Sequence, residues 1–286
     1  MEWELVMVNT KNIRKSICDV GKLLYDRGYI DASGGNISVR DGDKVYLSPR
    51  QSGEHHQWTI EEDAIIVTDM CKVPIIGELD KITRESVSHY YIYNNFPQVK
   101  AIVHAHPPYM MSFGSAHMEI PAVSEGTRCV IGTIPITNIE ESVPGSSQQA
   151  QRVVENFIQR KKIDPECGLI CNIPFHGVFS AATDLNYAFL YVEVSEINCK
   201  ILINRQIMFG NNPKADLSIH HQISREEINS IDQNKEACEV GFKYRDPFGN
   251  ETVYQGAGQK SPVASGVSSD LISKITEEVL KKIKNS

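Results

Sequence analysis

The spacing of apolar residues along residues 10–204 predicts a mixture of helices and strands. In residues 10–28 apolar side chains recur every three or four positions, as on the buried face of a helix. The predicted helices span residues 10–28, 84–95, 146–162 and 184–204, and the predicted strands span residues 37–39, 45–47, 64–68, 100–105, 134–136, 168–171 and 177–180. Ser146 and Thr183 are the expected N-caps of the last two helices. Because the elements alternate irregularly and hairpins occur, we expect an α/β fold with a mostly antiparallel or mixed sheet.

The composition divides the chain into a long first part and a polar remainder. Residues 1–215 have the pattern of a catalytic domain, and residues 216–254 form a polar extension with a hairpin pattern at 243–254. Glycine, serine and proline are frequent in residues 255–269, which is typical of a flexible linker. Residues 270–286 carry apolar side chains at helical spacing opposite a charged face, so we expect an amphipathic helix there.

The charge balance and the cysteines argue against some classes of protein. The chain has 29 basic and 36 acidic residues, a formal net charge of −7, whereas nonspecific nucleic-acid binding needs a basic face. No run reaches the roughly 20 apolar residues of a membrane helix, and residues 1–9 lack the basic start of a signal peptide. The seven cysteines have an odd count and loose spacing, which indicates reduced thiols. We therefore expect a cytoplasmic protein without nucleic-acid or membrane partners.

Three histidines have the pattern of a catalytic zinc site. His104 and His106 alternate along a predicted strand, so both lie on one face, and Pro107-Pro108 ends that strand. His176 supplies a third imidazole, and three histidines with one open position are a ligand set of catalytic Zn²⁺. The alternative is that His104 and His106 are two surface residues of a strand.

Glu85 is the candidate acid/base beside this metal. It stands at the start of a predicted helix, and His89 follows on the same helix face. A carboxylate near a metal-bound carbonyl compound can move a carbon-bound proton. Taken alone, Glu85 is more typical of a solvated helix position, and His89 is more typical of a packing or hydrogen-bonding residue than of a ligand.

Four ordered motifs resemble the class II aldolase/adducin family. They are Ala32-Ser33-Gly34-Gly35-Asn36-Ile37-Ser38, Glu85-x3-His89-x3-Tyr93, Phe96-Pro97-x-Val99-x-Ala101-Ile102-Val103-His104-Ala105-His106-Pro107, and His176-Gly177-Val178 followed by a long helix with Glu193 and Glu196. The resemblance extends over residues 10–205. It implies the family's α/β/α layered domain, a homotetramer with active sites at subunit interfaces, and one Zn²⁺ per subunit held by His104, His106 and His176.

The resemblance also implies a substrate and roles for further residues. In the family's sugar-phosphate aldolases the glutamate that matches Glu85 moves the proton, and the loop that matches Gly35-Asn36 holds phosphate. Ser52-Gly53 matches a second phosphate-contacting pair less well, because the loop before it is longer here. We therefore expect a zinc-dependent lyase that binds a phosphorylated small sugar. It would cleave a ketose 1-phosphate of the L-fuculose or L-rhamnulose phosphate class to dihydroxyacetone phosphate and an aldehyde such as lactaldehyde.

The chain departs from the family pattern at two places. The family often has Pro-Ser-Ser before the glutamate, whereas this chain has Ile82-Thr83-Arg84. Thr83 keeps a hydroxyl, and Arg84 adds a cation that binds phosphate, selects a carboxylate or pairs with a surface acid. Glu125 stands where fuculose-phosphate aldolases have a tyrosine, and it is either a second acid near the metal or a structural residue. Dehydration, epimerisation or decarboxylation of a related sugar phosphate and an adducin-like non-enzymatic scaffold are therefore the alternatives.

The amphipathic pattern of residues 270–286 needs a surface to pack on, because so short a helix is marginal in water. A linker followed by such a helix resembles the encapsulation peptides of bacterial microcompartment enzymes. We therefore expect microcompartment shell proteins as partners and a location inside a microcompartment. The alternative is docking onto the protein's own tetramer. A membrane surface is disfavoured, since the polar face mixes acidic and basic residues.

Overall fold

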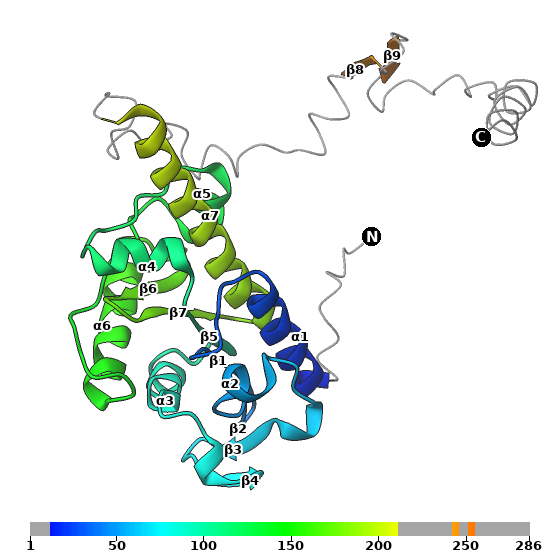
Figure 1. Ribbon diagram of the computed structural model, residues 1–286, viewed down its shortest axis with the longest axis vertical. Coiled ribbons are helices and arrows are strands. Elements are labelled where there is room, and N and C mark those ends of the chain that lie inside the picture. Colours follow the sequence, from blue (N-terminus) through cyan, green and yellow to red (C-terminus); the bar gives the residue numbers. More distant parts are fainter. Residues whose placement is uncertain (1–11, 211–241, 246–250, 255–286) are drawn as a thin grey trace, which may run out of the picture. The chain divides into compact units, whose positions relative to one another are not determined.

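The computed structural model describes residues 12–210 and the backbone of two further strands, residues 242–245 and 251–254. The chain divides into two compact units, Met1–Arg225 and Glu226–Ser286. The first unit holds the large sheet and its helices, which are coloured blue to yellow-green in Figure 1. The linker predicted at residues 255–269 and the helix predicted at residues 270–286 lie outside the described residues.

A seven-stranded sheet organises the first unit, in the order β4-β3-β2-β1-β5-β7-β6. Every neighbouring pair of strands is antiparallel. The strands are β1 (Asn36–Asp41), β2 (Lys44–Leu47), β3 (Ile66–Asp69), β4 (Pro74–Ile76), β5 (Ala101–Ala105), β6 (Leu169–Ile173) and β7 (Gly177–Ala182). Strands β5 and β7 lie inside the sheet and are buried along their whole length, so their ends are held in a fixed register.

Helices cover both faces of the sheet (Figure 1). The helices are α1 (Ile13–Asp26), α2 (Ser52–His56), α3 (Ser86–Asn95), α4 (Pro108–Ser115), α5 (Glu125–Ile131), α6 (Ser147–Ile163) and α7 (Leu185–Phe209). One apolar core contains residues of α1, α4, α5 and α7, and a second contains residues of α3 and α6. Strand β5 divides the two cores, since Val103 belongs to the first and Ile102 to the second. This arrangement confirms the α/β/α layers that the resemblance implied, and the sheet, expected to be mostly antiparallel or mixed, is antiparallel.

The predicted helix starts were partly right. The Ser146 side chain accepts a hydrogen bond from the Gln149 backbone N–H at 3.1 Å and caps α6, as expected. The cap of α7 is Asp184 rather than Thr183, because the Asp184 carboxylate accepts hydrogen bonds from two free N–H groups of the first turn. A carboxylate at this position also interacts favourably with the helix dipole.

One further prediction about local structure was wrong, and another was right but incomplete. Residues 134–136 form no strand, and Ile136 makes only an isolated bridge to Ile120. Pro135 lacks the N–H that a strand interior needs. Conversely, Pro107-Pro108 ends β5 as expected but also begins α4, with Pro108 at the first helical position. Proline is well suited to that position, because its missing N–H would have no partner there.

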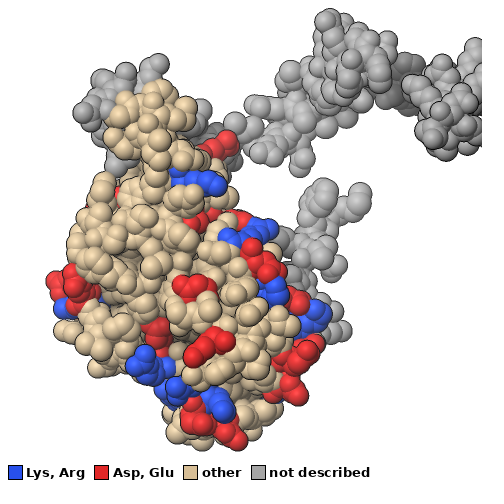
Figure 2. Space-filling model, viewed as in Figure 1, with Lys and Arg blue, Asp and Glu red and all other residues tan. Residues whose placement is uncertain are grey.

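The second unit contains an antiparallel hairpin of β8 (Phe242–Arg245) and β9 (Glu251–Tyr254), which confirms the hairpin predicted at residues 243–254. Among the described residues, no helix combines the length and the apolar character needed to cross a bilayer. Acidic and basic side chains are interspersed over the face of the first unit that Figure 2 shows.

Candidate metal centre and active site

The structure brings the three predicted histidines together where β5 ends and β7 begins. His104 is the fourth residue of β5, His106 follows its end, and His176 directly precedes β7. One nitrogen from each imidazole lies within 4.8 Å of the others, which is the spacing of ligands around a single ion. The ring centroids are 4.8 Å apart for His104 and His176 and 5.0 Å apart for His104 and His106.

Backbone and side-chain groups fix the orientation of two of these rings. Nδ1 of His104 lies 2.9 Å from the Val178 carbonyl oxygen, which can only accept, so Nδ1 carries a proton and Nε2 is the nitrogen that faces the site. Nδ1 of His106 faces the Asp31 carboxylate at 3.7 Å, and its Nε2 lies 3.2 Å from Nε2 of His104. A partner on the outer nitrogen is the usual device that aims an imidazole at a metal.

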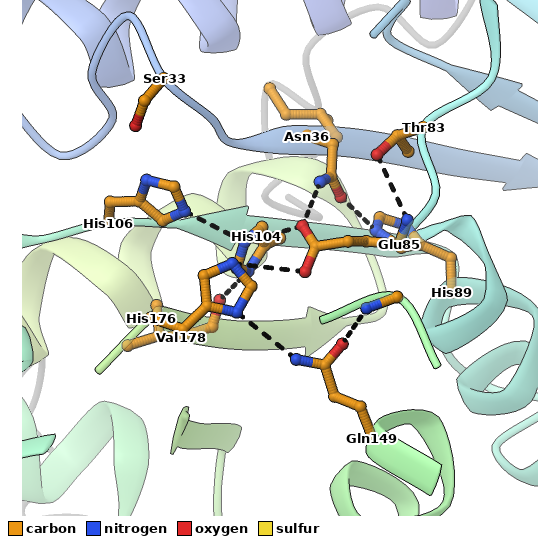
Figure 3. A network of polar contacts seen from close by, with 12 residues as sticks. Ser33, Asn36, Thr83, Glu85, His89, His104, His106, Gln149, His176 and Val178 are labelled. Carbon is orange, nitrogen blue, oxygen red and sulfur yellow. Dashed lines mark hydrogen bonds and ion pairs between the residues drawn. The ribbon is translucent and has the colours of Figure 1, made fainter. Parts of the chain in front are cut away.

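The carboxylate of Glu85 contacts two of the three histidines, His104 and His176 (Figure 3). Glu85 precedes α3, and its oxygens lie 2.9 Å from Nε2 of His104 and 3.4 Å from Nε2 of His176. Asn36, at the start of β1, donates its amide N–H to Oε2 of Glu85 at 2.9 Å. The side chain of Glu85 is only 12% exposed, so water screens these contacts weakly.

The protonation of the site follows from burial and from these contacts. Burial raises the pKa of the Glu85 carboxyl, but the imidazoles of His104 and His176 outweigh it and bring the pKa far below its ordinary value. Burial lowers the pKa of His106 and of His176 to about 4, and the charge of His104 acts in the same direction. His106 and His176 are therefore neutral near pH 7, which is the form that binds metals.

The residues fit a divalent cation. Oε1 of Glu85 is buried and has no hydrogen-bond partner among the described residues, although it faces His176. Three imidazole nitrogens beside a carboxylate form a donor set that suits Zn²⁺ and related transition metals.

The imidazole of His106 occupies space that side chains at Gly34 and Gly177 would fill. A Cβ atom at Gly34 would lie 2.2 Å from Cε1 of His106, and a Cβ at Gly177 would lie 2.7 Å from its Cδ2. Gly35 has φ +89°, a conformation that L-residues with side chains rarely adopt. The Gly-Gly-Asn and His-Gly motifs are thus explained in part by the packing of a metal ligand.

A cavity of about 380 Å³ opens beside the histidines. It is lined by Ser33, Gly34, Gly35, Asn36, Arg50, Gln51, Thr83, Arg84, Glu85, His106, Pro144 and His176. The lining therefore includes the predicted anion-binding residues Gly35, Asn36, Thr83 and Arg84. His104 lies beneath it and is fully buried.

Besides His104, three predicted site residues do not line this cavity. Ser52 and Gly53 follow the lining residues Arg50 and Gln51 along the chain, but both are buried. The Ser52 hydroxyl donates to the Pro49 carbonyl at 2.6 Å. Glu125 is exposed at the first position of α5, after its N-cap Ser124. In a single chain the described structure does not bring these residues to the metal site.

Sequence reasoning missed several residues of the site, among them Arg50, Asp31 and Gln149. Arg50 lines the cavity, Asp31 faces His106, and the Gln149 amide nitrogen lies 3.4 Å from Nδ1 of His176. Gln149 is the third residue of α6 and is fully buried, although glutamine is usually exposed. No sequence pattern singles out these residues, because each contact joins segments that are distant along the chain.

Comparison with known proteins identifies the family. Residues 15–203 match the family model of the class II aldolase and adducin N-terminal domain, and the chain belongs to this family. An L-fuculose phosphate aldolase of Methanococcus maripaludis is 31% identical over 179 residues, covering 61% of this chain and 87% of the relative. A 5-deoxy-D-ribulose 1-phosphate aldolase of Bacillus thuringiensis is 28% identical over 188 residues, covering 66% of this chain and 83% of the relative. A solved structure of an L-fuculose 1-phosphate aldolase has a TM-score of 0.60 at 23% identity, covering 68% of this chain and 87% of that one, and supports the fold.

Relatives with other reactions also match. They include a methylthioribulose-1-phosphate dehydratase of Sulfurihydrogenibium, 24% identical over 197 residues, and a 3-oxo-tetronate 4-phosphate decarboxylase of Haemophilus influenzae, 33% identical over 98 residues. All of these relatives are lyases. The chain is accordingly an enzyme, a metal-dependent lyase of the class II aldolase type, and the non-enzymatic scaffold is set aside.

Proposed function

We propose that this enzyme is a zinc-dependent aldolase that cleaves a ketose 1-phosphate of the L-fuculose or L-rhamnulose phosphate class. The products would be dihydroxyacetone phosphate and an aldehyde such as lactaldehyde. The observation that carries the proposal is the position of Glu85, whose carboxylate contacts His104 and His176 and lines a cavity that also contains Arg50 and Arg84. His104, His106 and His176 would hold one Zn²⁺ per subunit.

The reaction needs a group that holds and returns one proton. Breaking the bond between C3 and C4 turns the C4 hydroxyl into an aldehyde, which releases a proton, and leaves the bonding electron pair at C3, which takes one up. A bound zinc ion would act as the Lewis acid that polarises the neighbouring carbonyl. Glu85 is ionised, so it can accept the released proton and deliver it to C3.

Uncompensated positive charge in the cavity supports an anionic substrate. Within the described residues, neither Arg50 nor Arg84 forms an ion pair, and the Arg50 side chain donates only to the Asp80 backbone carbonyl at 3.2 Å. The only carboxylate of the lining is Glu85, which is already paired with histidines. Guanidinium groups bind phosphate oxygens with two parallel hydrogen bonds.

Thr83 and the glycine loop add neutral donors on the same side. The backbone N–H of Glu85 donates to Oγ1 of Thr83 at 3.4 Å, which leaves the Thr83 O–H group for a ligand. Gly35 and Asn36 line the same cavity. Arg84, Thr83 and the loop at Gly35 and Asn36 would together hold the phosphate of the substrate.

Dehydration or decarboxylation of a related sugar phosphate is the second candidate, favoured by the dehydratase and decarboxylase relatives. A panel of ketose phosphates and sugar-acid phosphates separates the reactions by their products. Release of dihydroxyacetone phosphate from a ketose 1-phosphate is the expected result. Release of carbon dioxide, or loss of water without carbon–carbon cleavage, would overturn the aldolase proposal. Assembly as a homotetramer, a role of Glu125 from a neighbouring subunit and a microcompartment location stay predictions.

A further inference from the structure

We propose that His89 is a positioning residue, which acts through Asn36 to aim one amide N–H at Glu85 and the other at the anion of the substrate. His89 does not line the cavity and is completely buried, so it cannot touch the substrate itself. The inference rests on the proposed role of Glu85, and it adds a reason why the Asn36 amide has one fixed orientation.

A continuous row of hydrogen bonds runs from the interior of α3 to the active site. The Tyr93 hydroxyl lies 2.7 Å from Oγ of Ser38, and that oxygen lies 2.6 Å from Nδ1 of His89. On the other side of the ring, Nε2 of His89 lies 2.6 Å from Oδ1 of Asn36, whose Nδ2 lies 2.9 Å from Glu85. Figure 3 shows the last part of this row, with Asn36 between His89 and Glu85.

The Glu85 carboxylate sets the direction of every bond in this row. The Asn36 amide nitrogen donates to Oε2 of Glu85, and its oxygen therefore faces His89. Nε2 of His89 then carries the ring proton, and Nδ1 accepts the Ser38 hydroxyl. Ser38 in turn accepts the Tyr93 hydroxyl. Burial lowers the pKa of His89 to about 3, so the ring is neutral and has the single proton that this pattern requires.

The fixed amide serves two partners at once. An amide nitrogen has two hydrogens, and one of those of Asn36 is bound to Glu85. The second has no partner within the described residues and remains for a ligand in the cavity that Asn36 lines. A flipped amide would instead place its oxygen against the Glu85 carboxylate and against an incoming phosphate, and both contacts would be repulsive.

The sheet supports this assignment. Asn36 on β1 is the direct cross-strand partner of His104 on β5, so the backbone fixes Asn36 beside the metal site. The backbone leaves the rotation of the amide group open. Among the described residues, His89 is the only group that bonds to Oδ1 of Asn36, and it is therefore the group that selects the orientation.

Two amide substitutions test the proposal as a matched pair. In His89→Gln the side-chain nitrogen reaches nearly as far as Nε2 and can still donate to Asn36. In His89→Asn the shorter side chain cannot. We expect His89→Asn to lower kcat about 10- to 100-fold, a common loss when a supporting residue of a metal site is removed, and His89→Gln to recover most of it.

Binding of inorganic phosphate to the zinc-loaded protein, measured by calorimetry, provides a readout that does not depend on the reaction. We expect about tenfold weaker binding for His89→Asn than for His89→Gln, with equal zinc content. If no ketose phosphate is cleaved by the unchanged enzyme, the proposed function fails while this measurement still decides the role of His89. Equal kcat and equal phosphate affinity in the two variants would overturn the proposal.

Ser38→Ala provides an independent test should His89→Asn not fold. This variant leaves His89 in place but removes the donor to Nδ1, so the ring proton is no longer confined to Nε2. We expect kcat and phosphate affinity to fall about threefold to tenfold, which corresponds to the loss of one buried hydrogen bond. A folded, zinc-loaded Ser38→Ala enzyme with unchanged kcat and phosphate affinity would contradict the positioning role.

Discussion

The two sides of the active-site cavity are built differently. On the metal side, the histidines lie at the ends of adjacent buried strands, and the outer nitrogens of His104 and His106 face protein groups. On the anion side, Arg50, Thr83 and Arg84 come from loops, and the two arginines are exposed. On the metal side, contacts within the protein thus orient the side chains before a substrate binds. On the anion side, the hydrogen-bond donors are left without an acidic partner and are available to a substrate. We infer that the metal side determines whether the enzyme is active and the anion side determines its substrate.

Removing a metal ligand should have the largest effect. His104→Ala should lose zinc and reduce kcat/KM at least about 10³-fold, since a Lewis acid contributes several kcal/mol to the transition state. Zinc content by mass spectrometry and the rate of product release check this. His117→Ala, at an exposed histidine that pairs with Glu141 on the surface, is the matched control and should keep its zinc. A His104→Ala enzyme with full zinc and full activity would rule out this metal site.

Replacing the acid/base should separate catalysis from metal binding. Glu85→Gln keeps the shape of the side chain but cannot take up a proton, so kcat should fall about 10²- to 10⁴-fold. Zinc should remain bound, because the three imidazoles still hold it. The variant thus tests whether Glu85 acts on the proton rather than on the metal. Unchanged kcat in a zinc-loaded Glu85→Gln enzyme would remove Glu85 from the mechanism.

Changes on the anion side should affect binding more than turnover. Arg84→Ala should raise KM for the phosphorylated substrate about tenfold through the loss of charge-assisted hydrogen bonds, with a smaller change in kcat. Steady-state kinetics at several salt concentrations measure both. Arg152→Ala is the matched control, because Arg152 pairs with Glu140 outside the cavity. If the two variants have the same KM, Arg84 does not contact the substrate.

The smallest expected effect concerns stability at acid pH. His89 has a pKa of about 3 in the folded protein, below the ordinary value of 6.5, because it is buried. The unfolded chain therefore takes up a proton below pH 6.5 that the folded protein does not, and stability falls as the pH drops from 6.5 towards 3. Between pH 7.5 and pH 5 the shifted pKa of His89 lowers the free energy of unfolding by about 2 kcal/mol. Urea unfolding at both pH values should therefore show a loss of stability that is larger by about this amount in the unchanged protein than in His89→Gln. Equal losses in the two proteins would contradict it.

The two sides of the cavity also differed in how far the sequence predicted them. His104 and His106 were predictable because residues two apart on a strand share a face. His176 was the candidate third imidazole of a zinc ligand set, and the family resemblance implied all three as ligands. The α/β fold and the mostly antiparallel or mixed sheet followed from apolar periodicity and hairpin signals, whereas the α/β/α layers followed from the family resemblance. These features depend on local spacing, which is visible in a sequence.

Other features depend on long-range packing and were not predictable in this way. Arg50 and Asp31 reach the site only because loops distant in sequence meet there. Gln149 reaches His176 from α6 for the same reason. The role of His89 needed the positions of Asn36 and the strand that holds it. The expectation that His89 is a hydrogen-bonding residue was right, but its partner could not be read from the chain.

The most direct test of the central claim is a zinc titration of the metal-free enzyme. The readout is release of dihydroxyacetone phosphate from the ketose 1-phosphate that the panel selects. The proposed function predicts no release without zinc, a rise that ends at one equivalent per subunit, and no rise for His104→Ala. Release at full rate from the metal-free protein, or from zinc-treated His104→Ala, would contradict it.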